Sequence, residues 1–155
     1  MKVLKLCICG TRDTPNAFEK VARAFDWIAP TFVALGASSV QILSGMGGSV
    51  DLAACRLAVE QHGKAAEYPA EWSKFGKRAG PIRNELMAHD CDAVLAVWDG
   101  RSPGTLDMIT RATKHGKLVY IYSDPCGLLA NRAVGGGNDH ATEACSPDSG
   151  GSEHG

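Results

Sequence analysis

Residues 92–105, DAVLAVWDGRSPGT, decide the fold because they carry one complete strand-to-helix turn. The apolar run at 93–98 predicts a β-strand. Ser102 is a residue type that caps helices, and Pro103 suits the first helical position because its missing N–H would have no partner there. A helix is therefore expected over 102–115. A strand that leads directly into a helix is typical of a parallel sheet.

The same alternation extends over most of the chain. Further strands are expected at 3–9, 40–43, 65–68 and 118–122, and further helices from Thr14-Pro15 to an end or kink near Pro30, at 50–62 and at 80–88. The polar stretch 69–80 between them predicts a functional loop. Strands joined by helices run parallel, and right-handed crossovers place helices on both faces. The sequence thus predicts an α/β fold, a Rossmann-like doubly wound parallel sheet of about five strands with helices on both faces.

Length and composition favour one domain without a long-range charge preference. The 155 residues are 45% apolar, which is enough for one sizeable core but too little for two ordinary domains. Acidic and basic residues number 17 and 16, so no overall field attracts nucleic acid or an anionic membrane. The chain leads directly into a strand without a long apolar segment, which predicts a cytoplasmic protein with no membrane partner.

The six cysteines do not form the pattern of a metal site or a disulfide framework. Cys7, Cys9, Cys55 and Cys91 lie among apolar or helix-forming neighbours, where free thiols behave as small hydrophobic groups. Cys7 and Cys9 lack the C-x-x-C spacing of a zinc site. The sequence therefore predicts free thiols, no metal and no required cofactor.

Residues 125–155 are expected to form an extension to a domain at 1–124. Glycine, serine and acidic residues dominate its end, and such a segment buries too little apolar surface to offset the entropy of ordering. We therefore predict disorder for about the last twenty residues. Cys126, His140, Cys145 and His154 lie in or near this segment, where a solvated tail is favoured over weak metal binding.

Four turns follow predicted strands, at the edge of a parallel sheet where ligands bind and helix N-termini offer unpaired N–H groups. Three glycines at 45–48 expose successive amides, as an anion-binding turn requires, although an ordinary tight turn has the same composition. The four segments are Gly10-Thr11-Arg12, Ser44-Gly45-Met46-Gly47-Gly48, the helix start at Gly80-Pro81-Ile82-Arg83-Asn84, and 99–105.

Several groups at these turns suit a phosphorylated ligand. Asp51 can accept a hydrogen bond from a ribose hydroxyl, or it favours the helix dipole. The amides of Gly104 and Thr105 are free for an anion, or they begin an ordinary capped helix. The guanidinium of Arg83 suits bidentate phosphate binding, or it is a solvated surface group. The chain has no G-x-x-x-x-G-K-[ST] and no G-x-G-x-x-G after its first strand, which disfavours a Walker ATPase or an ordinary NAD dehydrogenase.

Taken together, the segments GTR (10–12), SGMGGSVDLAA (44–54), GPIRNELM (80–87) and DAVLAVWDGRSPGTLDMI (92–109) resemble the SLOG superfamily, specifically its YspA and cpYpsA-related branch. The resemblance runs over about 2–122. It implies a Rossmann-like fold, a homo-oligomer such as a homodimer, and a site for a nucleotide or nucleotide-derived small molecule. The residues expected to bind that ligand are Gly10, Thr11, Arg12, Ser44, Gly45, Gly47, Gly48, Asp51, Arg83, Asn84, Asp99, Gly100, Ser102, Gly104 and Thr105.

One alternative is N-glycosidic bond hydrolysis, by similarity to the LOG-type phosphoribohydrolases of the same superfamily. Their catalytic arginine is retained as Arg83, but their glutamate position falls on Met108, which cannot transfer a proton. If the protein is an enzyme of this kind, the candidate catalytic residues are therefore Arg83, Asp51, Asp99 and Asp107.

A further alternative is single-stranded DNA binding, because DNA-processing protein A contains a related domain. Basic residues at 74, 77, 78 and 83 accompany aromatic ones at 72 and 75, an arrangement that suits phosphate contacts and base stacking. A loop that closes over a small ligand is the competing interpretation. The basic and aromatic residues of this DNA-binding alternative are Lys74, Lys77, Arg78, Arg83, Trp72 and Phe75. We favour nucleotide binding over both alternatives.

Overall fold

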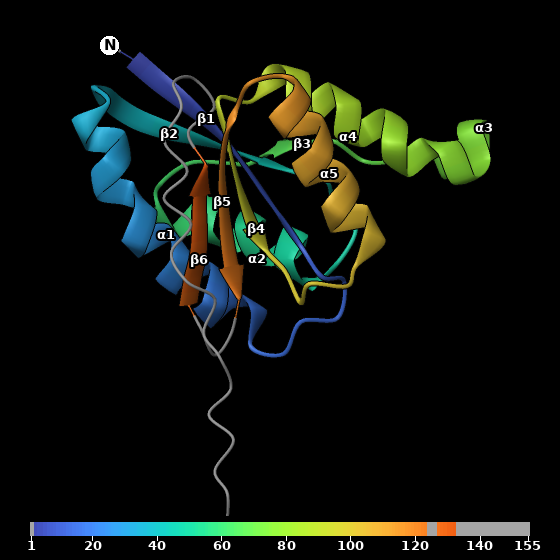
Figure 1. Cartoon of the computed structure of the whole chain (residues 1–155), viewed down its shortest axis with the longest axis horizontal. Helices are drawn as coiled ribbons and strands as arrows, with labels where there is room; N and C mark the ends of the chain where they lie inside the picture. The colour runs from blue at the N-terminus through green and yellow to red at the C-terminus, as the bar shows by residue number, and fades with distance from the viewer. Residues whose placement is uncertain (1, 124–126, 133–155) are drawn as a thin grey trace, which may run out of the picture.

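Helices and strands alternate along the chain in the computed structural model, which describes residues 2–123 and 127–132 (Figure 1). The strands are β1 (Lys2–Gly10), β2 (Ala37–Ser44), β3 (Ala66–Glu67), β4 (Ala93–Val97), β5 (Leu118–Ser123) and β6 (Gly127–Arg132). The helices are α1 (Ala17–Ala34), α2 (Ser49–Glu60), α3 (Trp72–Phe75), α4 (Ala79–Asp90) and α5 (Pro103–Lys114), with a short 3₁₀ turn, η1, at Gly76–Arg78. All of the strands predicted from the sequence are present.

The sheet has the order β3-β2-β1-β4-β5-β6, and β1 to β5 pair in parallel. From β1 the chain first builds outward through β2 to β3, and it then returns to add β4 and β5 on the other side. The order therefore reverses between β1 and β4, which is the position where open α/β sheets bind ligands. This arrangement confirms the predicted doubly wound, Rossmann-like fold.

Helices cover both faces of the sheet, and successive residues of β1 contact different helical layers. Leu6 and Ile8 belong to the core formed with α1 and α2, whereas Cys7 and Cys9 belong to the core formed with α4 and α5. This alternation follows from the two-residue repeat of a strand. Cys7 and Cys9 are free and buried, as their apolar surroundings predicted.

The sixth strand is antiparallel and lies in the segment expected to be an extension of the domain. β6 pairs with β5, with Tyr120 opposite Asn131 and Ser123 opposite Gly127. Its sequence carries little signal for a strand because an antiparallel edge strand pairs through its backbone and needs no crossover helix. The predicted disordered end and its cysteines and histidines lie outside the described residues.

Helix α1 differs from its prediction at both ends. It begins at Ala17 after Asn16, which has a left-handed φ of 50°, instead of beginning at Thr14-Pro15. The Thr14 N–H and hydroxyl are used elsewhere, by Ser49 Oγ and the Thr11 carbonyl. The helix also continues past Pro30, because burial of the flanking Ile28 and Phe32 side chains offsets the hydrogen bond that proline loses. In the described part of the chain, no helix has the length and apolar character needed to cross a membrane.

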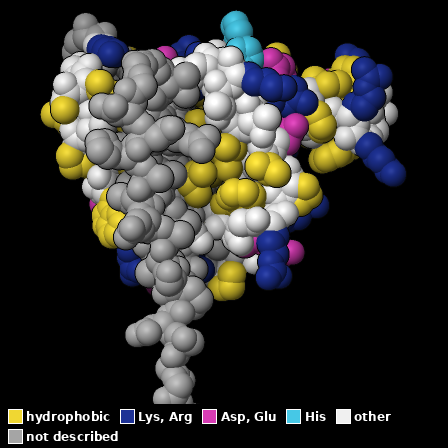
Figure 2. All heavy atoms as spheres, viewed as in Figure 1, with side chains coloured by type: hydrophobic (Ala, Val, Ile, Leu, Met, Phe, Trp, Pro, Cys, Tyr) yellow, Lys and Arg dark blue, Asp and Glu magenta, His cyan; other side chains and the backbone are white. Residues whose placement is uncertain are grey.

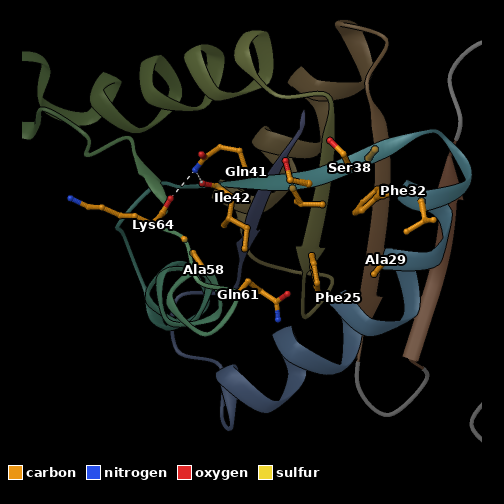
Figure 3. Close-up of a pocket in the computed structure, with 14 residues that line it drawn as sticks. Phe25, Ala29, Phe32, Ser38, Gln41, Ile42, Ala58, Gln61 and Lys64 are labelled. Carbon is orange, nitrogen blue, oxygen red and sulfur yellow. Dashed lines mark hydrogen bonds between the residues drawn. The ribbon is translucent and has the colours of Figure 1, made fainter. Parts of the chain in front are cut away.

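A cavity of about 340 Å³ lies between α1, α2 and β2 (Figure 3). Phe25, Phe32 and Ile42 contribute apolar walls, and the Gln41 side-chain amide closes one side by donating 2.8 Å to the Lys64 carbonyl. The predicted ligand-binding residues do not line this cavity. The candidate site must therefore be sought at the other end of the strands.

Gly10 ends β1 where there is no room for a side chain. A Cβ atom there would overlap the Val97 carbonyl oxygen and lie 2.8 Å from Val50 Cγ2. We expect Gly10→Ala to lower the free energy of unfolding by about 1–3 kcal/mol or more, because overpacking forces backbone shifts. Urea unfolding measures this loss. Gly104→Ala is the matched control, since its Cβ would meet nothing within 4 Å. Equal losses in both variants would contradict the packing argument.

Candidate functional site

A cleft of about 280 Å³ opens at the carboxyl end of β1, beside the reversal of strand order. Its walls come from the end of β1, the turn before α2, the middle of α4 and the first turn of α5. We call it the arginine cleft. It is lined by Cys9, Gly10, Arg12, Gly47, Gly48, Asp51, Arg83, Asn84, Met87, Ser102, Pro103, Gly104, Thr105 and Met108. Most of the predicted ligand-binding residues therefore meet here, whereas Cys9, Met87 and Met108 carry no chemical signal that sequence reasoning could use.

The turn before α5 is organised by Asp99. Its Oδ1 atom accepts hydrogen bonds of 2.8 Å from the backbone N–H groups of both Arg101 and Ser102, and these bonds hold the pKa of the carboxyl below its ordinary value. Ser102 occupies the N-cap position, but its side chain makes no capping hydrogen bond, contrary to prediction. The amides of Gly104 and Thr105, in the first helical turn, have no intrahelical partner. They lie at the wall of the cleft.

The glycine-rich turn before α2 is held by Asp51 and Ser44. Asp51 Oδ2 accepts 2.8 Å from the Gly47 N–H, and Ser44 Oγ donates 2.7 Å to the Asp51 carbonyl. Between them Met46 adopts a left-handed φ of 59°, an uncommon conformation for a residue with a side chain. Burial raises the pKa of Asp51, although the Gly47 hydrogen bond and the charges of nearby arginines oppose this shift. Ser44 is buried behind the cleft and does not line it.

Arg83 extends from α4 across the cleft to the glycine-rich turn. Its Nη1 atom donates to the Gly45 carbonyl, and its Nε atom donates 3.0 Å to Asn84 Oδ1. Within the described residues Nη2 has no hydrogen-bond partner, and neither does the guanidinium of Arg12. The cleft therefore holds one oriented and one exposed arginine with donors available. Gly45 itself lies behind Arg83.

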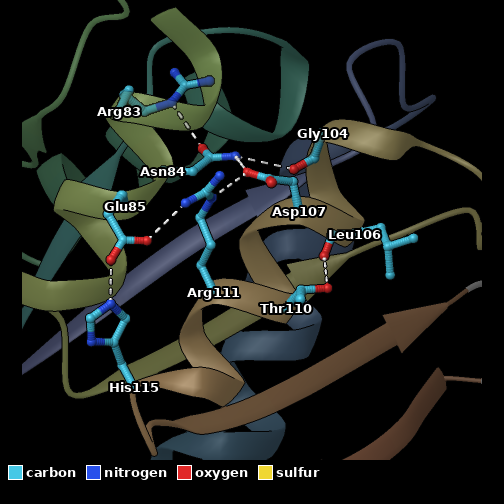
Figure 4. A network of polar contacts seen from close by, with 9 residues as sticks. All are labelled: Arg83, Asn84, Glu85, Gly104, Leu106, Asp107, Thr110, Arg111 and His115. Carbon is cyan, nitrogen blue, oxygen red and sulfur yellow. Dashed lines mark hydrogen bonds and ion pairs between the residues drawn. The ribbon is translucent and has the colours of Figure 1, made fainter. Parts of the chain in front are cut away.

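A chain of polar contacts joins α4 to α5 behind Arg83 (Figure 4). Asn84 is buried, and its Nδ2 atom donates 2.9 Å to Asp107 Oδ2. Arg111 donates 2.9 Å both to the same Asp107 oxygen and to Glu85 Oε2. Glu85 Oε1 in turn lies 2.5 Å from His115 Nε2. The four-residue spacing of Asp107 and Arg111 is the sequence signal that could have indicated part of this network.

Of the three aspartates considered as catalytic candidates, Asp51 alone lines the arginine cleft. The Asp107 carboxylate is bound by Asn84 and Arg111 within the helix pair. Asp99 faces a second cleft of about 360 Å³, together with Thr11 and Trp98. Any carboxylate chemistry in the arginine cleft would therefore depend on Asp51.

Thr11 forms the boundary between the two clefts. Its N–H donates 3.0 Å to the Val97 carbonyl, and its Oγ1 accepts 3.0 Å from the Asp99 N–H. Gly10 and Arg12, on either side of it in the chain, line the arginine cleft instead. The structure thus does not bring Thr11 or Asp99 together with the other predicted residues, and Gly100 lines neither cleft.

The polar stretch predicted as a loop is largely helical. α3 and η1 form an arm that projects from the body of the molecule, carrying basic and hydrophobic side chains together (Figures 1 and 2). Trp72 on this arm is 52% exposed, and Lys74 Nζ lies 4.9 Å from the centroid of the Phe75 ring. Arg83, which the sequence pattern grouped with these basic residues, lies on α4 and lines the arginine cleft. Among residues 2–123 and 127–132, no three histidine, cysteine or acidic side chains gather as metal ligands would.

Comparison with known proteins supports this fold class. No protein-family model and no curated protein matches the chain. A solved structure of DNA processing protein A from Helicobacter pylori, described for its single-stranded DNA binding mode, is similar with a TM-score of 0.50 and 21% identity. The match covers 76% of this chain and 64% of that one, so this chain spans less than two thirds of the length of its structural relative. The similarity establishes a Rossmann-like α/β protein.

The environment of Asp51 generates a prediction about pH. Its raised pKa means that the folded protein holds this proton more tightly than the unfolded chain does, so the stability that this group contributes is lost as pH rises from its ordinary value of 3.8 through the folded value. An asparagine side chain at this position cannot ionise but keeps an acceptor for the Gly47 amide. We therefore expect the stability of Asp51→Asn relative to the wild type to increase with pH across this window. Urea unfolding at a series of pH values measures the difference.

Asp99→Asn provides the control of opposite sign. The pKa of Asp99 is lowered by its backbone hydrogen bonds, so the wild type gains stability relative to this variant as pH rises towards 3.8. Parallel pH profiles for the two variants would contradict the account of Asp51.

Proposed function

We propose that the protein binds a nucleotide or a nucleotide-derived small molecule in the arginine cleft. The observation that supports this proposal is the convergence of Arg12, Arg83 and the first-turn amides of α5 on one cleft at the switch point of the sheet. The resemblance of four separate motifs to the SLOG superfamily supports the same ligand class. We expect that no cofactor is required, and pairing into a homo-oligomer is an expectation of that resemblance.

The phosphate of the ligand fits between Arg83 and the start of α5. The amides of Gly104 and Thr105 and the positive end of the helix dipole favour an anion. A planar guanidinium adds paired donors that match phosphate oxygens. Arg12, which has no hydrogen-bond partner among the described residues, supplies a second positive charge. These groups together favour a phosphate over a carboxylate, because a phosphate offers more oxygens for the same donors.

Asp51 suits the sugar of the ligand. Its carboxyl lies in the cleft and is already fixed by the Gly47 amide, so it is positioned to accept a hydrogen bond from a ribose hydroxyl. N-glycosidic hydrolysis would depend on the same group. Release of free base from nucleoside monophosphates, followed by chromatography, separates a hydrolase from a binding protein.

Replacement of Arg83 tests the proposed function. We expect Arg83→Ala to weaken binding of a nucleoside monophosphate by about 1.5–3 kcal/mol, the range for hydrogen bonds to charged groups, and to leave binding of the unphosphorylated nucleoside nearly unchanged. Isothermal titration measures both affinities. Arg23→Ala, which removes an exposed arginine from α1, is the matched control. Equal loss for nucleotide and nucleoside would exclude a phosphate contact at Arg83.

Single-stranded DNA binding is the second candidate function, and the arm favours it. The solved structure similar to this chain is named for that activity. Lys74, Lys77 and Arg78 lie on the arm beside the exposed Trp72, and aromatic rings with basic neighbours are the usual means of holding single strands.

This second candidate predicts binding that depends on salt. Replacing Lys74, Lys77 and Arg78 with glutamine should lower affinity for a labelled oligonucleotide and reduce the dependence of log K on log salt by about 0.7 for each phosphate that is no longer neutralised. Fluorescence anisotropy over a range of salt concentrations measures the slope. An unchanged slope would exclude the arm as a DNA-binding surface.

A further inference from the structure

A groove of about 310 Å³ lies between the arm and α4. Tyr68, Phe75, Ile82 and Leu86 give it a largely apolar lining, and Arg83 also contributes to its wall. We call it the arm groove. Because Arg83 lines the arginine cleft as well, the two hollows share this one residue.

Helix α4 separates the arginine cleft from the arm groove. Ile82 and Leu86, four residues apart, line the arm groove, whereas Met87 lines the arginine cleft. Residues four apart lie on one face of a helix, and the residue that follows each of them lies on an adjacent face. From α4, the Arg83 side chain is long enough to reach the Gly45 carbonyl. Arg83 is therefore a side chain that the arginine cleft and the arm groove have in common.

The groove has the chemistry of a base-binding surface. Leu86, which lines the groove, is 55% exposed, so apolar surface remains available there to a flat ring. Phe75 lines the groove, and the Lys74 ammonium lies against its ring. Glu67 and Glu71 also line the groove, and the Glu71 carboxylate lies 3.9 Å from Lys74 Nζ. Aromatic side chains with adjacent cations are the arrangement on which nucleobases stack.

We propose that the arm groove is a second subsite, which binds the nucleoside on the other side of the phosphate held at Arg83. The inference rests on the proposed function of the arginine cleft and extends it to a ligand class: two nucleosides joined by a phosphodiester. A free dinucleotide and the end of a single strand both have this chemistry. The arginine cleft holds one nucleoside, Arg83 holds the bridging phosphate, and the arm groove holds the second base.

The test compares two ligands that carry the same charge. Adenylyl-(3′→5′)-adenosine and the methyl ester of adenosine 5′-monophosphate each contain one phosphodiester, but only the first has a second nucleoside. We expect the dinucleotide to bind the wild-type protein about tenfold more tightly, as one stacked base provides. Phe75→Ala and Leu86→Gln should each remove this gain and leave the methyl ester unaffected. Leu52→Gln is the matched control, because Leu52 on α2 is also 55% exposed and should change neither affinity.

The outcomes separate this inference from the proposed function. Binding of the methyl ester with no gain for the dinucleotide, or a gain that survives both arm variants, overturns the second subsite alone. Failure of both ligands to bind overturns the proposed function and the subsite together. A labelled decadeoxyadenylate distinguishes the sources: a strand whose binding is weakened by Leu86→Gln places a strand end in the groove, and a strand that does not bind while the dinucleotide does assigns the groove to free dinucleotides.

Discussion

The close approach of β4 and α2 to the backbone of Gly10 is the constraint on which the arginine cleft depends. Gly10, at the end of β1, pairs with Val97 of β4, and the Val50 side chain of α2 also lies against Gly10. Any side chain at Gly10 would therefore push β4 and α2 away from β1. Immediately afterwards, the Arg12 carbonyl accepts hydrogen bonds of 2.8 Å from both the N–H and the hydroxyl of Ser49. These contacts fix the glycine-rich turn and Arg12 beside the start of α5.

The opposite wall is fixed by polar contacts in place of close backbone packing. Buried Asn84 uses its amide nitrogen to join α4 to Asp107 of α5, and its oxygen accepts from Arg83. Arg83 reaches from this wall to the Gly45 carbonyl on the other. An arginine held at both ends before a ligand arrives loses less conformational freedom on binding, which favours affinity. The Arg83 guanidinium is therefore oriented by Asn84 on one side and by the Gly45 carbonyl of the glycine-rich turn on the other.

Sequence patterns predicted the doubly wound sheet and the edge at which its turns meet, because apolar runs and the turns that follow them are local features of the chain. Contacts between elements could not be predicted in this way: the bond from Arg83 to Gly45 depends on how α4 packs against the turn before α2. The position of Thr11 illustrates the limit. It belongs to the same turn as Gly10 and Arg12, yet it lies at the second cleft, where its hydroxyl accepts a hydrogen bond from the Asp99 N–H. Strand β6 pairs antiparallel with β5, so it needs no crossover helix that would mark it as a strand in the sequence.

A crystal structure of the protein grown with adenosine 5′-monophosphate would locate the phosphate and so test whether the arginine cleft binds nucleotides. We expect a phosphate within hydrogen-bonding distance of Arg83 and of the backbone N–H groups of Gly104 and Thr105, with the ribose beside Asp51. A nucleotide bound in the second cleft beside Trp98, or one that binds in solution but leaves the arginine cleft empty in the crystal, would contradict this expectation.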